Sequence, residues 1–160
     1  MPAHGAVVPF SLTPSKEAQV DRGHVLSKEF QVRGVARLEG DRLTLEWSGS
    51  IEITEVKEGS VRHLRESVPA QRLVLPASRI ASIELRSRWW KPRIELLTTG
   101  LGPLELVATA IAGRVVLQIA RRDWHAAAEL VSHAQLEMAD AALRDAERGR
   151  DVPRESNADR

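Results

Sequence analysis

The spacing of apolar residues changes once along this chain, near Asp123, and this change constrains the fold more than any other feature. Before it, apolar and polar residues alternate in short runs, which is the period of a β-strand. After it, apolar residues recur every three to four positions, which is the period of an α-helix. We therefore predict a mainly β fold closed by one long C-terminal helix.

About seven short antiparallel strands are predicted before the change. The clearest two flank Glu39-Gly40-Asp41, whose composition suits a hairpin turn. Later runs are separated by turns that contain proline or glycine. Each gap is too short for the dozen or so residues that a parallel crossover needs. The predicted strand residues are Phe30, Val32, Ala36, Leu38, Leu43, Leu45, Trp47, Ile51, Ile53, Leu73, Leu75, Ile83, Leu85, Ile94, Leu96, Leu104, Leu106, Ala108, Val115, Leu117 and Ile119.

The predicted helix begins after Asp123, which is a good N-cap residue, and Gly149 provides a C-terminal stop. About 25 residues at 1.5 Å each give a length of roughly 37 Å. Its inner face is predicted to consist of Trp124, Ala127, Ala128, Val131, Gln135, Met138 and Ala142.

The ends of the chain and one internal segment lack a clear period. We expect residues 1–27 to form a flexible or loosely docked arm, residues 28–148 to form the domain, and residues 149–160 to be a disordered tail. Residues 54–70 are highly charged and leave two alternatives, a long loop or a ragged edge strand.

Composition excludes several classes of site. The chain has no cysteine, which excludes disulfides, a thiol nucleophile and every Cys-ligated metal site. The net charge is +1, from 23 basic and 22 acidic residues, so any anion-binding surface must be a local patch. No run approaches the roughly 18 apolar residues of a membrane helix, and the first residues lack the basic start of a signal peptide. We expect a cytoplasmic protein.

Two segments carry a resemblance to a known family. LVLPASRIASIELR (residues 73–86) forms a Leu-Pro-x-Ser-x-Ile step into the next strand, and VVLQIARRDWHAAAELV (residues 115–131) runs from the last strand into the helix. Over about residues 28–147 the chain resembles a bacterial pleckstrin-homology-like (PH-like) domain. The resemblance implies two nearly orthogonal sheets in a partly open barrel, with the helix closing one end.

The same resemblance implies a binding or scaffolding module that is not an enzyme and needs no cofactor. Relatives that bind inositol phosphates use a basic loop between the first two strands. The corresponding segment here is the acidic Glu39-Gly40-Asp41, which argues against that site. Some bacterial relatives self-assemble, and the resemblance extends that expectation to this chain.

The most distinctive local feature is a pair of tryptophans between cations. Neighbouring strand residues point to opposite faces, so at most one tryptophan can face the core of a regular strand. Exposed tryptophan beside cations suits a protein partner, with an anionic membrane as the alternative; we expect no nucleic acid. The competing interpretation is that one ring fills the barrel while the N-terminal arm or another protomer covers the other. The predicted partner-binding residues are Arg86, Arg88, Trp89, Trp90, Lys91 and Arg93.

The helix carries a second apolar stripe nearly opposite Met138, formed by Leu136, Ala139, Leu143 and Ala146. A helix packed on one sheet buries a single stripe. Leu136 and Leu143 therefore predict self-association into a homo-oligomer, unless they are simply scattered exposed leucines, which need no explanation.

No catalytic motif is present, and Gly100-Leu101-Gly102 reads as a hairpin turn. His125, Glu129 and His133 share a helix face, but we interpret them as a solvated surface and expect no metal. The predicted function is a non-catalytic binding or self-assembly module. The alternatives are a peripheral anionic-membrane domain and a β-barrel that binds a small ligand in a pocket containing His63, Arg65 or Glu66.

Overall fold

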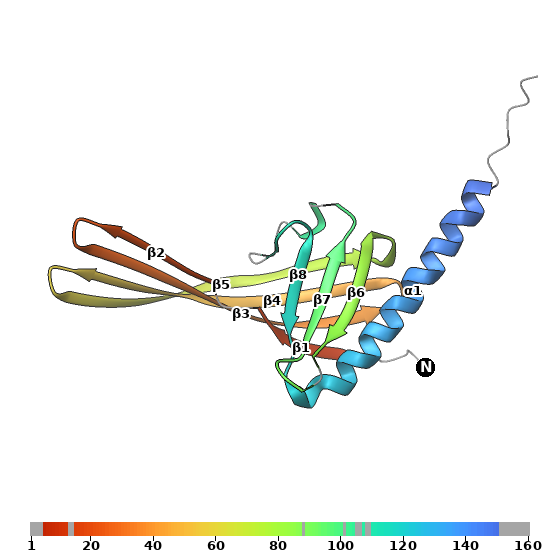
Figure 1. Cartoon of the computed structure of the whole chain (residues 1–160), viewed down its shortest axis with the longest axis horizontal. Helices are drawn as coiled ribbons and strands as arrows, with labels where there is room; N and C mark the ends of the chain where they lie inside the picture. Colours follow the sequence, from red (N-terminus) through yellow and green to blue (C-terminus); the bar gives the residue numbers. More distant parts are fainter. Residues whose placement is uncertain are drawn as a thin grey trace, which may run out of the picture.

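A computed structural model describes residues 5–12, 15–87, 89–100, 102–104, 107 and 110–150. These residues form an antiparallel sheet of eight strands and one C-terminal helix, α1 (Trp124–Arg150), as Figure 1 shows. The strands are β1 (Val7–Ser11), β2 (Ser15–Asp21), β3 (His24–Glu39), β4 (Arg42–Lys57), β5 (Ser60–Pro76), β6 (Ile80–Arg86), β7 (Arg93–Thr98) and β8 (Arg114–Gln118). Short 3₁₀ turns are η1 (Ala77–Arg79), η2 (Gly102–Leu104) and η3 (Arg121–Asp123). The predicted fold class is confirmed.

The strands follow the order β5-β4-β3-β1-β8-β7-β6, and β2 pairs with β3 beside this path. Every pair is antiparallel, as the short gaps in the sequence require. β1 joins the two halves of the sheet because it pairs with residues 33–37 of β3 and, through Ser11, with Gln118 of β8. The end strands β5 and β6 are not paired with each other, so the sheet does not close into a barrel.

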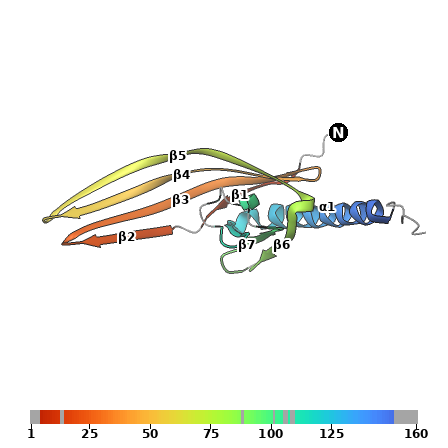
Figure 2. The ribbon, with the colours of Figure 1, turned by 90° about the horizontal axis from the view of Figure 1, so that it is seen from above.

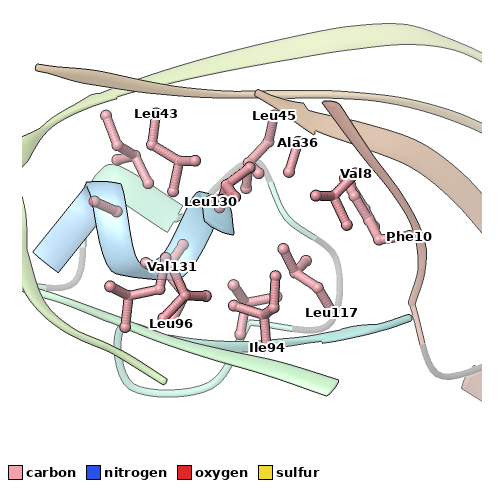
Figure 3. Close-up of a cluster of buried hydrophobic side chains, with 14 of the residues drawn as sticks. Val8, Phe10, Ala36, Leu43, Leu45, Ile94, Leu96, Leu117, Leu130 and Val131 are labelled. Atoms are coloured by element: carbon pink, nitrogen blue, oxygen red, sulfur yellow. The ribbon is translucent and has the colours of Figure 1, made fainter. Parts of the chain in front are cut away.

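The core lies between the two halves of the sheet and the first half of α1. Figure 3 shows Leu43 and Leu45 of β4 facing Ile94 and Leu96 of β7, with Leu130 of the helix between the sheet halves. The four strand positions are the inward ones of the predicted strands, whereas Leu130 was not among the residues predicted for the inner face of the helix, and all five side chains are almost fully buried. Each fully buried side chain of this size contributes about 1.5–3 kcal/mol to folding. Aliphatic side chains therefore fill the interior.

The helix continues well past the sheet. Ala141 is its last buried residue, and residues 142–150 are exposed, so the C-terminal part projects from the body in Figure 1. Ala142 was predicted to face inward but is exposed, because the buried face of the helix runs through Leu130, Ala134 and Ala141 and Ala142 lies about 100° around the helix from Ala141. Gln135 is also mainly exposed, although its Nε2 donates a hydrogen bond to the backbone oxygen of Ile83 at 2.9 Å. Within the described ranges, no helix has the length and apolar composition needed to cross a bilayer.

A four-stranded arm extends from the other end of the molecule. It consists of β2 with residues 24–31 of β3, 50–57 of β4 and 60–67 of β5, and it projects beyond the other strands in Figures 1 and 2. Two tight turns close its tip, Arg22-Gly23 and Glu58-Gly59, and all four residues have positive φ. Positive φ at both central residues is the signature of the type I′ hairpin turn.

The arm corrects the expectation for residues 1–27 and settles which of the two alternatives holds for residues 54–70. Residues 1–27 were expected to form a flexible or loosely docked arm, whereas the structure places β1, β2 and the start of β3 within this range. The charged sequence of β2 has no apolar period because its exposed residues contact only one neighbouring strand. Residues 54–70 are strand on both sides of a tight turn. Leu104 was expected in a strand but lies in η2, while Leu106, Ala108 and residues 151–160 lie outside the described residues.

Candidate functional site

The segment from Arg86 to Arg93, here called the tryptophan turn, connects β6 to β7. Trp89 and Trp90 are 74% and 76% exposed. The interpretation in which one of them fills the core is therefore wrong. Ser87 and Lys91 have positive φ, so the segment leaves strand geometry and the alternation of faces no longer applies.

Basic residues lie on both sides of Trp89 and Trp90 in the chain. Arg86 pairs with Glu84 and Arg93 with Glu95, while Lys91 is exposed. The backbone N–H of Ile119 donates to the oxygen of Pro92 at 2.8 Å, which holds the start of η3 beside the turn. η3 adds two more exposed cations, Arg121 and Arg122. Of the predicted partner-binding residues, Arg88 alone lies outside the described residues.

Two guanidinium groups hold the carboxylate of Glu95 in β7. Arg93 Nε donates to Glu95 Oε1 at 3.0 Å, and an Arg114 terminal nitrogen donates to Oε2 at 2.8 Å. The hydrogen bond from Arg93 and the charges of both arginines lower the pKa of Glu95 below its ordinary value of 4.5, while burial opposes them. The Glu95 carboxylate therefore holds the guanidinium group of Arg93, one of the cations of the tryptophan turn, in place.

Glu95→Gln is expected to lower stability near neutral pH and to lower it less in acid. A carboxylate with a lowered folded-state pKa stabilises the fold above its unfolded pKa, and this contribution is lost as the pH falls through the folded value. The stability difference between the wild type and the variant should therefore shrink below about pH 4.5. Urea unfolding over a pH series measures it, and a difference that stays constant with pH would contradict the role given to Glu95.

Apolar side chains also gather on the inner face of the arm, the face that continues the core. The register places Phe30, Ile51, Ile53 and Leu64 on this face, and Val68 lies on it directly beside the arm. None of them is fully buried, and Leu64 is 52% exposed. In the body, α1 and the strands β6–β8 cover the same face, whereas no described element covers it along the arm (Figure 2). A sheet face with uncovered apolar side chains is a candidate interaction surface.

The inner face of the arm also carries more acidic than basic residues. The register puts four carboxylates on it, those of Glu17, Asp21, Glu55 and Glu66, and three cations, those of Lys28, Lys57 and Arg62. Glu55 accepts a hydrogen bond from His24 at 2.8 Å, on the same face. The surface is thus apolar towards the body and negative along β2, while its β5 edge carries one charge of each sign, Arg62 and Glu66.

The root of the arm, where it leaves the body, depends on a glycine. A Cβ atom at Gly34 would lie 2.3 Å from the backbone oxygen of Glu46 and 2.6 Å from the ring of Phe10. Because there is no side chain at this position, Phe10 can pack across β3 against the strand that carries Trp47. Trp47 is only 6% exposed and is the tryptophan that the core uses.

The outer side of α1 carries the stripe predicted from its spacing. Leu136 and Leu143 are 59% and 62% exposed, on the opposite side from the buried Ala134 and Ala141. Their role in self-association stays a prediction. Among the described residues, no three His, Cys, Asp or Glu side chains are grouped so that they could hold a metal ion.

The residues named for an internal ligand pocket do not meet in one. His63, Arg65 and Glu66 lie on the exposed arm part of β5, where His63 bonds to Thr54 and Arg65 to Ser50. A groove of about 500 Å³ lies instead on the outside of β3–β5, lined by Arg33, Arg72 and Glu46 among others. Glu46 there is already paired with Arg37 at 2.9 Å and with Arg72 at 3.4 Å.

No known relative identifies the chain. No protein-family model matches the sequence, and no curated protein or solved structure matches it either. The resemblance to PH-like domains therefore stays a prediction, and the argument for function rests on the surfaces described above.

Proposed function

We propose that this chain is a non-catalytic scaffolding module that associates with copies of itself through the tryptophan turn. The observation that carries the proposal is the exposure of Trp89 and Trp90, at 74% and 76%. Each tryptophan buries about 150–250 Å² when it is covered. Tryptophan and arginine are also the residues that most often dominate the energy of protein interfaces.

The charges of the turn favour a protein surface over a lipid surface. Arg86 and Arg93 are already engaged by Glu84 and Glu95. Attraction to an anionic membrane contributes on the order of 1 kcal/mol per nearby cation, and these pairs reduce the number of cations that could contribute. The remaining positive charge is enough to orient a contact and to select an acidic partner surface.

Light scattering coupled to size exclusion tests the proposal. We expect the full chain to show a mass above 17.7 kDa that rises with concentration. Trp89→Ser with Trp90→Ser should return the mass to that of a monomer. Because both rings are mostly exposed, the double variant should stay folded and unfold cooperatively in urea when it is compared with the wild type as a monomer.

A second double variant separates the turn from the helix. If the contact lay on the helix stripe, as the sequence alone predicted, Leu136→Asp with Leu143→Asp would lower the mass without unfolding the domain, whereas a contact through the turn leaves the mass of this variant unchanged. If the helix variant alone disrupts association while the turn variant assembles normally, the contact lies on α1 and the role proposed for the turn is wrong.

A further inference from the structure

We infer that the surface that receives the tryptophan turn is the inner face of the arm on a second copy of the chain. The inference rests on the proposed self-association and names the two surfaces that meet. Both lie on every copy, but they are different surfaces, so the contact is heterologous.

Shape supports this pairing. The strands β3, β4 and β5 arch in Figure 2, and their hollow side is the side of the core. Four strands about 4.8 Å apart give a face roughly 14 Å wide, and seven residues at about 3.3 Å give a length of roughly 23 Å. A tight turn carrying two indole rings fits within that area.

Chemistry supports it as well. The turn presents two exposed aromatic rings beside Lys91, and η3 adds Arg121. The inner face of the arm presents uncovered apolar side chains with Glu17 and Glu66 at its two edges. The inner face has one more carboxylate than cation and is most acidic along β2, at Glu17 and Asp21, so the exposed cations of the turn favour an orientation in which they lie beside that edge.

The β5 edge of the arm is protected against pairing with a strand of another chain. The inner face of the arm is therefore the surface through which the arm would bind a partner. β5 is an edge strand of 17 residues, but Arg62 and Arg65 lie on its arm portion and Pro69 interrupts it. Pro69 lies in a β-bulge, where the register shifts between Trp47 and Gly49 of β4. Charges, proline and bulges are the devices by which natural edge strands avoid sheet-to-sheet aggregation.

Two variants block the two surfaces separately. Trp89→Ser with Trp90→Ser removes the inserting side chains and leaves the arm intact. Leu64→Lys with Glu66→Lys places positive charge on the inner face and leaves the turn intact. Because Leu64 and Glu66 are exposed, this variant should fold normally. Val61→Lys is the matched control, since Val61 is 56% exposed on the same strand but on the outer face.

Mixing the variants tests the pairing directly. Each variant alone should be a monomer, with self-association weakened by about thirtyfold or more. The equimolar mixture should recover a complex of about twice 17.7 kDa, because one variant supplies an intact turn and the other an intact arm. Val61→Lys should assemble like the wild type, and added salt should weaken every complex.

The outcomes separate this inference from the proposed function. If the Leu64→Lys, Glu66→Lys protein assembles like the wild type, the arm is not the receiving surface, although self-association through the turn stands. If both variants are monomers and the mixture stays monomeric, the contact is not between turn and arm. If the wild type itself is a monomer at every concentration, the proposed function fails and this inference fails with it.

Discussion

Leu130→Ala is expected to lower the free energy of unfolding by about 3 kcal/mol, within the range of about 2–5 kcal/mol for buried leucines. Leu130 is 1% exposed and lies between the two halves of the sheet in Figure 3. Truncation removes its transfer free energy and leaves a cavity that the surrounding strands can close only in part. Guanidinium unfolding followed by circular dichroism at one fixed protein concentration measures the loss.

Leu136→Ala is the matched control for this prediction. It makes the same substitution on the same helix, six residues further on, where the side chain is 59% exposed. Its effect on the unfolding free energy of the monomer should stay within about 0.5 kcal/mol. Equal losses for the two variants would mean that α1 does not bury the face described here.

Trp47→Ala is expected to cost about 3–5 kcal/mol of unfolding free energy. Trp47 is 6% exposed and lies opposite Gly34 at the root of the arm. Its loss would leave the largest cavity that a single truncation can make there and would loosen the junction between the arm and the body. Equilibrium unfolding and the intensity of blue-shifted tryptophan emission both report the change.

Trp90→Ala is the matched control, because it removes the same side chain from an exposed position. Because Trp90 is 76% exposed, its removal should change the stability of the monomer by less than about 0.5 kcal/mol and should reduce the red-shifted emission instead. If Trp90→Ala destabilised the monomer as much as Trp47→Ala, the tryptophan turn would belong to the core and would not be free to bind a partner.

The body of this fold could be predicted from sequence because each of its elements buries one face. Leu43 and Leu45 follow the period of a strand that faces the core, and Ala127 and Val131 follow the period of a helix, whereas the buried Leu130, Ala134 and Ala141 were not among the residues predicted for the inner face.

The β3–β4 hairpin at Gly40, the β6–β7 hairpin before Arg93 and the start of α1 after Asp123 followed from turn and cap chemistry. The predicted hairpin turn at Gly100, in contrast, does not form, because Gly102 begins η2 and β8 starts only at Arg114.

The arm could not be predicted in the same way because no second layer covers it. Its inner face mixes Lys28 and Glu55 with Phe30 and Ile53, so the alternation that identifies a half-buried strand is blurred. β2 contacts only β3, and its turn is Arg-Gly instead of the Asn-Gly or Asp-Gly that most strongly predicts a hairpin.

The two candidate surfaces differ in how much of each could be predicted from the sequence. The tryptophans and cations of the turn are adjacent in the chain, so their grouping was visible, whereas their exposure depended on the positive φ of Ser87 and Lys91. The inner face of the arm could not be predicted from the sequence. Glu17, Lys28, Ile53 and Leu64 come from four strands and form one row only because of the strand register.

Sedimentation equilibrium of the unmodified full chain, at a series of protein concentrations and at low and high salt, tests the central claim most directly. Self-association through a basic aromatic turn predicts a mass that rises above 17.7 kDa with concentration and falls again when salt is added. A mass of 17.7 kDa at every concentration and salt level would contradict it.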